Sequence, residues 1–154
     1  VASAGNDGPA CESLNVPPPI YLEVFSVGAV DRSGNLASFS SIGPVTIDQS
    51  GRIKPDLVAP GVEILSSLPE STYGRYSGTS MAGPHVAGTV ALMWSANPAL
   101  IGNIDLTEEL LIESADPYQG ILPQCSGAEN FPSTATGYGL LNAYKAVKLA
   151  IETR

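Results

Sequence analysis

The stretch "GTSMAGPHVAG", residues 78–88, holds the only histidine of the chain, five positions after a serine. A serine hydroxyl becomes a useful nucleophile when a nearby base removes its proton, so this pair suggests acyl-transfer chemistry. On a helix, however, residues five apart are rotated by about 500°, so Ser80 and His85 would point roughly 140° apart. We therefore predict that His85 is a buried histidine that hydrogen-bonds within the core, and that it is not the base for Ser80.

The run that starts at this serine has the pattern of a helix that passes through a protein core. The sequence "SMAGPHVAGTVALMWSAN" carries small and large apolar residues on all sides. Pro84 is tolerated near a helix start, where the first N–H groups have no acceptor within the helix, so we expect the helix to begin at 79–81. Ser80 would then lie at a positive helix end that favours an anion. The plainer alternative is an ordinary capping serine.

The rest of the chain alternates strand and helix patterns. Strands are predicted at 1–5, 23–30, 36–40, 56–61 and 62–68, a tight hairpin at 73–78, and further helices at 106–115 and within 137–154. Several of these strands are apolar throughout, which is typical of a sheet covered on both faces. We expect one α/β domain, a three-layer sandwich with a mostly parallel sheet and helices on both faces.

The charge balance narrows the classes of partner. Fifteen acidic residues against seven basic ones give a formal net charge of −8. This excess argues against nucleic acid or an anionic membrane surface as partner, and it favours solubility. No apolar run approaches the roughly 18–20 residues that span a bilayer. Val1 reads as the middle of a strand, so we expect the chain to be a piece of a longer protein.

Two cysteines, Cys11 and Cys125, lie far apart in the sequence. Neither has a histidine or a further cysteine near it, which makes a metal site a poor interpretation. Two buried thiols and one long-range disulfide are both compatible with this spacing.

Several blocks of the chain, in one order, resemble one enzyme family. The sequence "GTSMAGPHVAG" resembles the nucleophile motif G-T-S-x-[SA]-x-P-H-V-[AG]-G of the subtilisin-like serine proteases, the subtilases of peptidase family S8. In the same order as in that family, "VASAGNDG" resembles the strand that ends in the oxyanion-hole Asn, and "SVGAVDRSGNLASFSSIGP" and "KPDLVAPG" resemble the segments that follow. The ending "GYGLLNAYKAV" is also similar. The run "GPACESLNVPPPIYLEVFSVGAV" is similar to bacillopeptidase F-like members.

This resemblance implies the following roles. Residues 1–154 would be the C-terminal portion of a single catalytic domain that hydrolyses peptide bonds in polypeptides. Ser80 would be the acylated nucleophile, and the Asn6 side chain with the Ser80 N–H would bind the oxyanion. The predicted substrate-binding residues are Ala2, Ser3, Ala4, Gly5 and Thr79. Asp7 is either an acid at the rim of the pocket for the residue before the scissile bond, favouring a basic residue there, or a solvated turn residue.

The resemblance also concerns cofactors and location. No cofactor is required for the chemistry, and a structural Ca²⁺ is an option in this family, but no Asp/Asn cluster of ligand type assigns a metal residue here. Family members are mostly secreted, which implies an extracellular location and favours the disulfide between the two cysteines.

The catalytic triad of the family is incomplete in this chain. Its order is Asp, His, then Ser, yet nothing here resembles "D-[ST]-G" or "H-G-T-x-[VC]-A-G". We expect the base and its carboxylate to belong to a missing N-terminal half, and this chain alone to be inactive. The alternative is a non-catalytic subtilase-like binding or structural domain. A sheet edge exposed by the missing half would also favour self-association.

Overall fold

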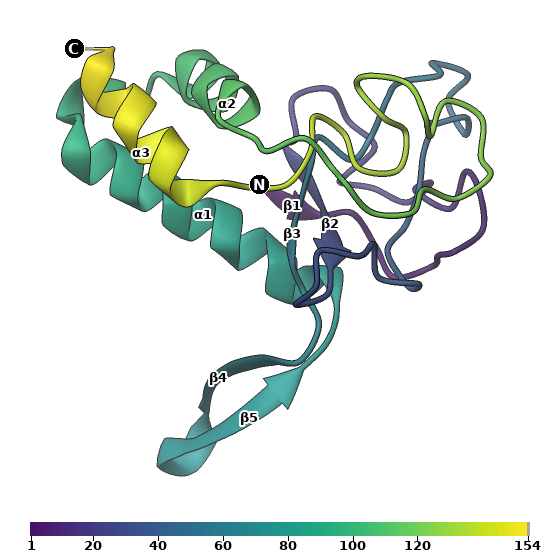
Figure 1. Ribbon diagram of the computed structural model, residues 1–154, viewed down its shortest axis with the longest axis horizontal. Coiled ribbons are helices and arrows are strands. Elements are labelled where there is room, and N and C mark those ends of the chain that lie inside the picture. The colour runs from purple at the N-terminus through teal and green to yellow at the C-terminus, as the bar shows by residue number, and fades with distance from the viewer. Residues whose placement is uncertain (154) are drawn as a thin grey trace.

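The computed structural model describes residues 1–153. These residues form a three-stranded parallel sheet, three α-helices, a two-stranded hairpin and long irregular segments (Figure 1). The sheet has the order β1–β2–β3, with β1 at Ala2–Ser3, β2 at Ser26–Val30 and β3 at Leu57–Pro60. The helices are α1 at Thr79–Ala96, α2 at Ile104–Glu113 and α3 at Ala143–Glu152. Short 3₁₀ turns occupy Pro69–Ser71 and Pro98–Leu100. The α/β class and the parallel sheet are as predicted; Arg154, at the end of the last predicted segment, lies outside the described residues.

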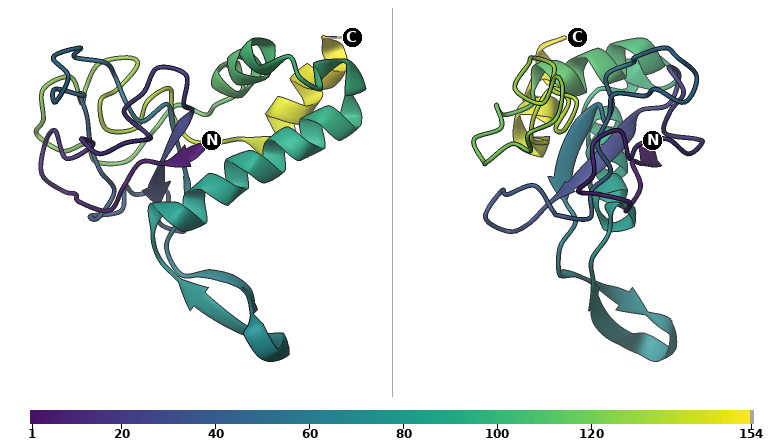
Figure 2. Two further views of the ribbon diagram at one scale, coloured as in Figure 1. Left: turned by 180° about the vertical axis from the view of Figure 1, so that it is seen from behind. Right: turned by 90° about the vertical axis from the view of Figure 1, so that its right-hand side faces the viewer.

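All three helices share one apolar core with one face of the sheet. Val27 and Ala29 of β2 alternate with residues of the other face, and they pack in one cluster with Val86 and Met93 of α1. Residues of α2 and α3 complete this cluster. The opposite face is covered by irregular segments: a Cβ at Gly28 would lie 3.0 Å from the Ser40 hydroxyl oxygen. Figures 1 and 2 accordingly show the sheet between the helices and a group of loops.

Helix α1 begins at Thr79, as the sequence predicts. Pro84 is then the sixth helical residue, beyond the first turn in which it was expected. Because proline has no N–H, the Ser80 carbonyl cannot accept the usual hydrogen bond from residue 84. The helix is buried on its sheet side and exposed on the other, so Val86 is fully buried and Leu92 is 56% exposed.

Two predictions of local structure, the hairpin at 73–78 and the strand at 36–40, are wrong. Strands β4 (Ile64–Leu68) and β5 (Thr72–Tyr76) form an antiparallel hairpin that projects from the body (Figure 1). Its turn lies at 69–71, where Glu70 and Ser71 have positive φ, so residues 73–76 form a strand instead of the predicted tight hairpin. The strand predicted at 36–40 is reduced to a single bridge between Val30 and Leu36.

Covalent and ionic crosslinks hold the loop side of the sheet. Cys11 and Cys125 form a disulfide, which settles the alternative left open by their spacing. The Lys54 ammonium, 3% exposed, donates to the Val24 carbonyl at 2.8 Å and to the Asp56 carboxylate at 2.7 Å. Asp56 also accepts from the Ser26 N–H, so this ion pair joins the start of β2 to the segment before β3. Among residues 1–153, no helix is long and apolar enough to cross a membrane.

Candidate active site

The candidate nucleophile, Ser80, is the second residue of α1 and is exposed. The chain reaches it directly from β5 through Gly78, whose N–H donates to the Gly61 carbonyl at 2.8 Å. Within residues 1–153, no hydrogen-bond partner is found for the Ser80 hydroxyl. Its backbone N–H belongs to the first turn of the helix, where N–H groups have no carbonyl to bind within the helix. Ser80 therefore offers a free hydroxyl and a free N–H at the positive end of a helix.

The Asn6 side chain is locked onto the residue before this serine. Its Oδ1 accepts from the Thr79 N–H at 2.9 Å and from the Thr79 hydroxyl at 3.0 Å. The same hydroxyl accepts from the Gly5 N–H at 3.2 Å, and Thr79 is fully buried. Because a backbone N–H can donate but not accept, these contacts fix which end of the amide is oxygen. The Asn6 Nδ2 has no acceptor among residues 1–153 and is therefore a free donor in this part of the chain.

The two free donors border one small space. A Cβ at Gly78 would lie 3.6 Å from the Asn6 Nδ2 and 3.7 Å from the Ser80 N. Both nitrogens therefore lie around the space that the missing side chain of Gly78 leaves open. Two N–H donors held rigidly beside a hydroxyl can stabilise a negative charge that develops on an oxygen in that space. This arrangement can support attack on a carbonyl group.

The predicted substrate wall, residues 2–5, divides between the two sides of the sheet. Ala4 is 3% exposed and packs in an apolar cluster with Leu14, Ile20 and Val45. Ser3 is half-buried and faces α1, since its hydroxyl oxygen lies 3.5 Å from where a Cβ of Gly83 would be. Ala2 and Gly5 are also half-buried. The side chain of Ala4 thus serves packing, and the role of the wall stays a prediction.

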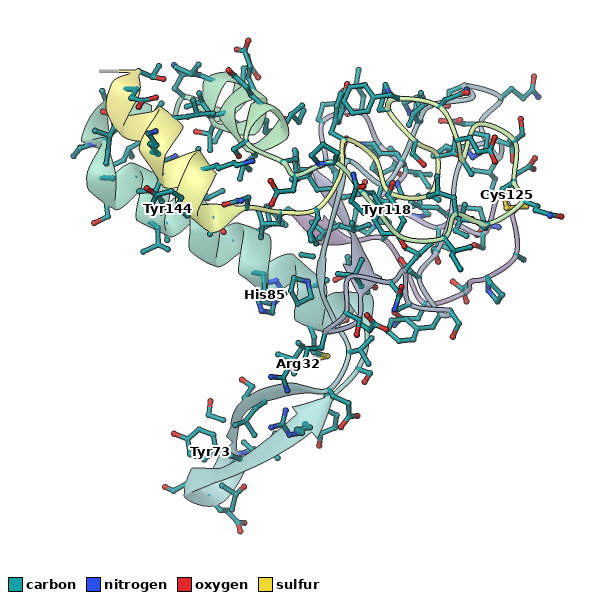
Figure 3. The ribbon with its side chains drawn as sticks, in the orientation of Figure 1. Arg32, Tyr73, His85, Tyr118, Cys125 and Tyr144 are labelled. Carbon is teal, nitrogen blue, oxygen red and sulfur yellow. A yellow bond between two sulfur atoms is a disulfide. The ribbon has the colours of Figure 1, made fainter. Side chains whose placement is uncertain are left out.

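His85 lies near the N-terminal end of α1, and it is not the core residue that the sequence suggested (Figure 3). It is half-buried, and its Nδ1 lies 2.9 Å from the Met81 carbonyl of its own helix. It lines a cavity of about 210 Å³ between α1 and β4, together with Ser80, Met81, Pro84, Ile64, Leu65 and Ser66. No hydrogen bond joins His85 to Ser80, although both are described. The nucleophile–base contact of a serine hydrolase is therefore not made by this pair.

Asp7, next to Asn6, is exposed, and its N–H donates to the Ser41 hydroxyl at 3.1 Å. Its Oδ2 lies 3.6 Å from where a Cβ of Gly5 would be, so both the rim and the turn interpretations stay open. Among the described residues, no group of three or more His, Cys, Asp or Glu side chains is placed to hold a metal ion.

Sequence reasoning missed Ser41, which holds the segment around Asn6 from both sides. Its N–H donates to the Gly5 carbonyl at 3.0 Å, and its hydroxyl accepts from the Asp7 N–H. No spacing rule connects it to Asn6, because the two segments lie more than thirty residues apart and meet through the tertiary fold. In the sequence, Ser41 is a serine in a turn-rich segment, and such serines are too common to indicate a supporting role.

Comparisons with known proteins agree with this geometry. The sequence pattern of the Subtilase family matches residues 1–139. Bacillopeptidase F of Bacillus subtilis (strain 168) is 42% identical over 84% of this chain and 8% of its own length. A thermophilic serine proteinase of Bacillus sp. (strain AK1) is 38% identical over 96% of this chain and 30% of its own length.

Solved structures give the same result. The CspB protease of Clostridium perfringens matches with a TM-score of 0.74 and 32% identity, over 94% of this chain and 30% of that one. The patellamide maturation protease PatA matches with a TM-score of 0.72 and 32% identity, over 97% of this chain and 50% of that one. The chain thus spans half or less of these relatives. With a family match over most of its length, the chain belongs to the subtilase family.

Proposed function

We propose that this chain is the nucleophile-bearing part of a serine endopeptidase that hydrolyses peptide bonds through an acyl-enzyme on Ser80. The observation that carries the proposal is the lock between Asn6 and Thr79. It turns the Asn6 Nδ2 into a free donor beside the Ser80 N–H, at the open end of a helix. Relatives described as serine proteinases support the same chemistry.

In the proposed reaction, the Ser80 oxygen attacks the carbonyl carbon of the scissile peptide bond while a base takes the hydroxyl proton. The carbonyl oxygen becomes an oxyanion that accepts from the Asn6 Nδ2 and the Ser80 N–H. Collapse of this intermediate breaks the C–N bond, and the base returns its proton to the leaving amine. Water then hydrolyses the ester, which releases the acid product and restores the serine.

The base and its carboxylate partner would come from an N-terminal half of the catalytic domain that precedes these residues. His85 is directed to its own helix, and no other histidine is present in the chain. Without triad partners, an oxyanion hole and substrate binding leave a small residual catalysis. The isolated chain would therefore have no practical peptidase activity.

Further parts of the proposal concern the surroundings of the enzyme. The disulfide between Cys11 and Cys125 supports an extracellular location, because disulfides persist in oxidising compartments. The proposal of a structural Ca²⁺ is supported only by the family resemblance. The proposal of self-association is supported only by the outer edge of β1. The polypeptide substrate would contact residues 2–5 beside Thr79, whose buried hydroxyl holds Gly5 in place.

Kinetics of the full-length protein test this proposal. In subtilisin, a relative of this chain, loss of a side-chain oxyanion donor lowers turnover by about 10²–10³. We expect Asn6→Ala to lower kcat to a similar extent with little change in KM, because the donor acts on the transition state. Asn15→Ala, in the same exposed loop, is the matched control and should leave kcat unchanged. Equal kcat values for Asn6→Ala and the wild type would refute the assignment of Asn6.

A further inference from the structure

The disulfide lies on the segment that carries the candidate oxyanion donor. Residues 5–14 run beside residues 39–43 and are held at both ends. At the first end, the Gly8 N–H donates to the Phe39 carbonyl at 2.9 Å. At the other end, the Leu14 N–H donates to the Ile42 carbonyl at 2.9 Å. Asn6 thus belongs to a strip whose order depends on these ties.

The middle of this strip has a different kind of tie. Within residues 1–153, residues 9–11 make no backbone hydrogen bond, and the Cys11–Cys125 disulfide joins them to the rest of the molecule. Glu12, directly after Cys11, has a φ of 59°, a left-handed conformation that non-glycine residues seldom adopt. Such conformations persist where the surroundings hold them. The disulfide and the hydrogen bond from the Glu12 N–H to the Gly43 carbonyl supply that support.

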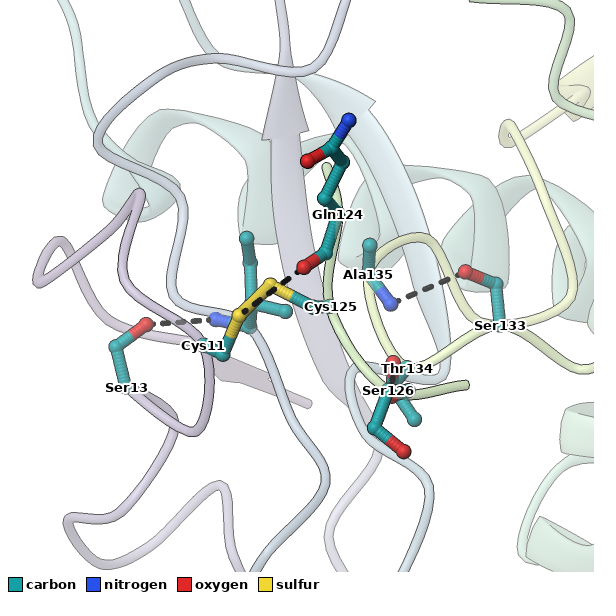
Figure 4. Close-up of a disulfide and its surroundings, with 9 residues drawn as sticks. Cys11, Ser13, Gln124, Cys125, Ser126, Ser133, Thr134 and Ala135 are labelled. Atoms are coloured by element: carbon teal, nitrogen blue, oxygen red, sulfur yellow. Dashed lines mark hydrogen bonds between the residues drawn. A yellow bond between two sulfur atoms is a disulfide. The ribbon is translucent and has the colours of Figure 1, made fainter. Parts of the chain in front are cut away.

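The partner cysteine belongs to a second long loop, residues 117–132 (Figure 4). Around Cys125 the loop bonds mainly to itself, through the Cys125 N–H to the Pro123 carbonyl and the Ala128 N–H to the Cys125 carbonyl. Cys125 also packs against a small apolar cluster of Ile42, Ala128 and Ala135. The disulfide is therefore the direct link between this loop and the strip that carries Asn6.

The link is open to reductants on one side. Cys11 is exposed, whereas Cys125 is half-buried. A thiolate of a dithiol can attack the Cys11 sulfur, break the S–S bond and release the Cys125 thiolate, which takes up a proton. The second thiol of the reductant then displaces Cys11. In total the dithiol is oxidised to a cyclic disulfide, and the two cysteines gain two electrons and two protons.

We infer that the Cys11–Cys125 disulfide is a redox-sensitive clamp on the strip that follows Asn6. When oxidised, it holds residues 9–12 and the loop around Cys125 against each other. When reduced, it releases both, and the position of the Asn6 donor becomes less defined. The conformational part stands on the contacts above, whereas the effect on catalysis rests on the proposed function.

Hydrogen exchange of the full-length protein, with and without dithiothreitol, tests the conformational part. We expect the hydrogen-bonded backbone amides of Glu12, Cys125 and Ala128 to exchange about tenfold faster after reduction, because local opening becomes easier. Amides in 57–59 and 85–93 should keep their rates. The double variant Cys11→Ser/Cys125→Ser should exchange as the reduced protein does and ignore the reductant. Unchanged rates in both loops, or faster exchange throughout the chain, would overturn the clamp.

Turnover under the same conditions tests the catalytic part. We expect reduction to lower kcat by roughly tenfold, since small misplacements of a catalytic group are costly. The double serine variant should start at the lower value and not respond to dithiothreitol. Faster loop exchange with unchanged kcat would show that the clamp does not reach Asn6, and would overturn this part. Absence of peptidase activity in either redox state would instead contradict the proposed function, while the exchange result still decides the clamp.

Discussion

The two sides of the sheet are stabilised in different ways. The helical side buries apolar side chains of all three helices against β2 and β3 in one cluster. The loop side has smaller apolar clusters, and a disulfide, a buried ion pair and many side-chain-to-backbone hydrogen bonds link its segments. Irregular segments form only scattered backbone hydrogen bonds with one another, such as Gly8 N–H to the Phe39 carbonyl, so side chains satisfy many of the remaining backbone groups and the crosslinks fix the segments in place. The candidate site lies where the two sides meet: Ser80 comes from α1, and Asn6 from the first loop.

The largest difference between the two sides is expected at the buried ion pair of the loop side. Lys54→Met leaves the Asp56 carboxylate without its cation, which should destabilise the protein by about 3–5 kcal/mol. Lys148→Met is the matched control, since its ammonium is exposed and its ion pair should contribute roughly 0–1 kcal/mol. Urea denaturation measures both. A loss under about 1 kcal/mol for Lys54→Met would mean that this pair does not hold the loop side.

The corresponding change on the helical side is a cavity in the core. Met93 is fully buried in the cluster of α1 and the sheet, so Met93→Ala should cost about 2–5 kcal/mol. The neighbouring Leu92 is 56% exposed, and Leu92→Ala should change the free energy of unfolding by roughly 0.5 kcal/mol or less. Thermal and urea denaturation give these values. Equal losses for the two variants would contradict the assignment of which α1 face packs on the sheet.

The smallest effect is expected at Asp116, an exposed carboxylate that binds Asn142 and Lys145 at the start of α3. Hydrogen bonds from Lys145 and Asn142 lower the pKa of Asp116 below its ordinary value of 3.8. A lowered pKa in the folded state adds stability above the unfolded pKa, and this contribution is lost as the pH falls through the folded value. Asp116→Asn should therefore lower Tm slightly near neutral pH. Below the folded pKa the two proteins should melt alike.

The melting temperatures of Asp116→Asn across the pH range are compared with those of a second variant that lacks an exposed carboxylate. Asp105→Asn, in the first turn of α2, tests whether any loss of an exposed carboxylate acts in the same way. A Tm difference for Asp116→Asn that is independent of pH would show that the ion pair with Lys145 is not its cause.

The sequence predicts the elements that carry strong patterns and misses those that depend on tertiary contacts. Helix α1 begins where expected, whereas strand β2 forms over Ser26–Val30, the second part of the predicted strand 23–30. The turn at 69–71 is not predicted from the sequence, because Glu70 and Ser71 adopt positive φ and no glycine at these positions indicates such a turn.

The candidate site divides in the same way. The motif around Ser80 and the strand before Asn6 place two chemistry-bearing residues by type and order. The lock between Asn6 and Thr79 joins residues 73 positions apart, and the support from Ser41 comes from the loop side. These contacts depend on how segments distant in the sequence meet, which spacing along the chain does not encode. The sequence of this chain does not identify a base, because its single histidine, His85, contacts the Met81 carbonyl of its own helix and makes no hydrogen bond to Ser80.

In the proposed enzyme, Ser80 and its oxyanion donors reside on this chain, while the base comes from elsewhere in the protein. Treatment with a fluorophosphonate, followed by mass spectrometry of the adduct, tests it most directly. We expect stoichiometric labelling of Ser80 in the full-length protein and none in the isolated 154-residue chain. Stoichiometric labelling of Ser80 in the isolated chain, or an adduct on a different residue of the full-length protein, would contradict it.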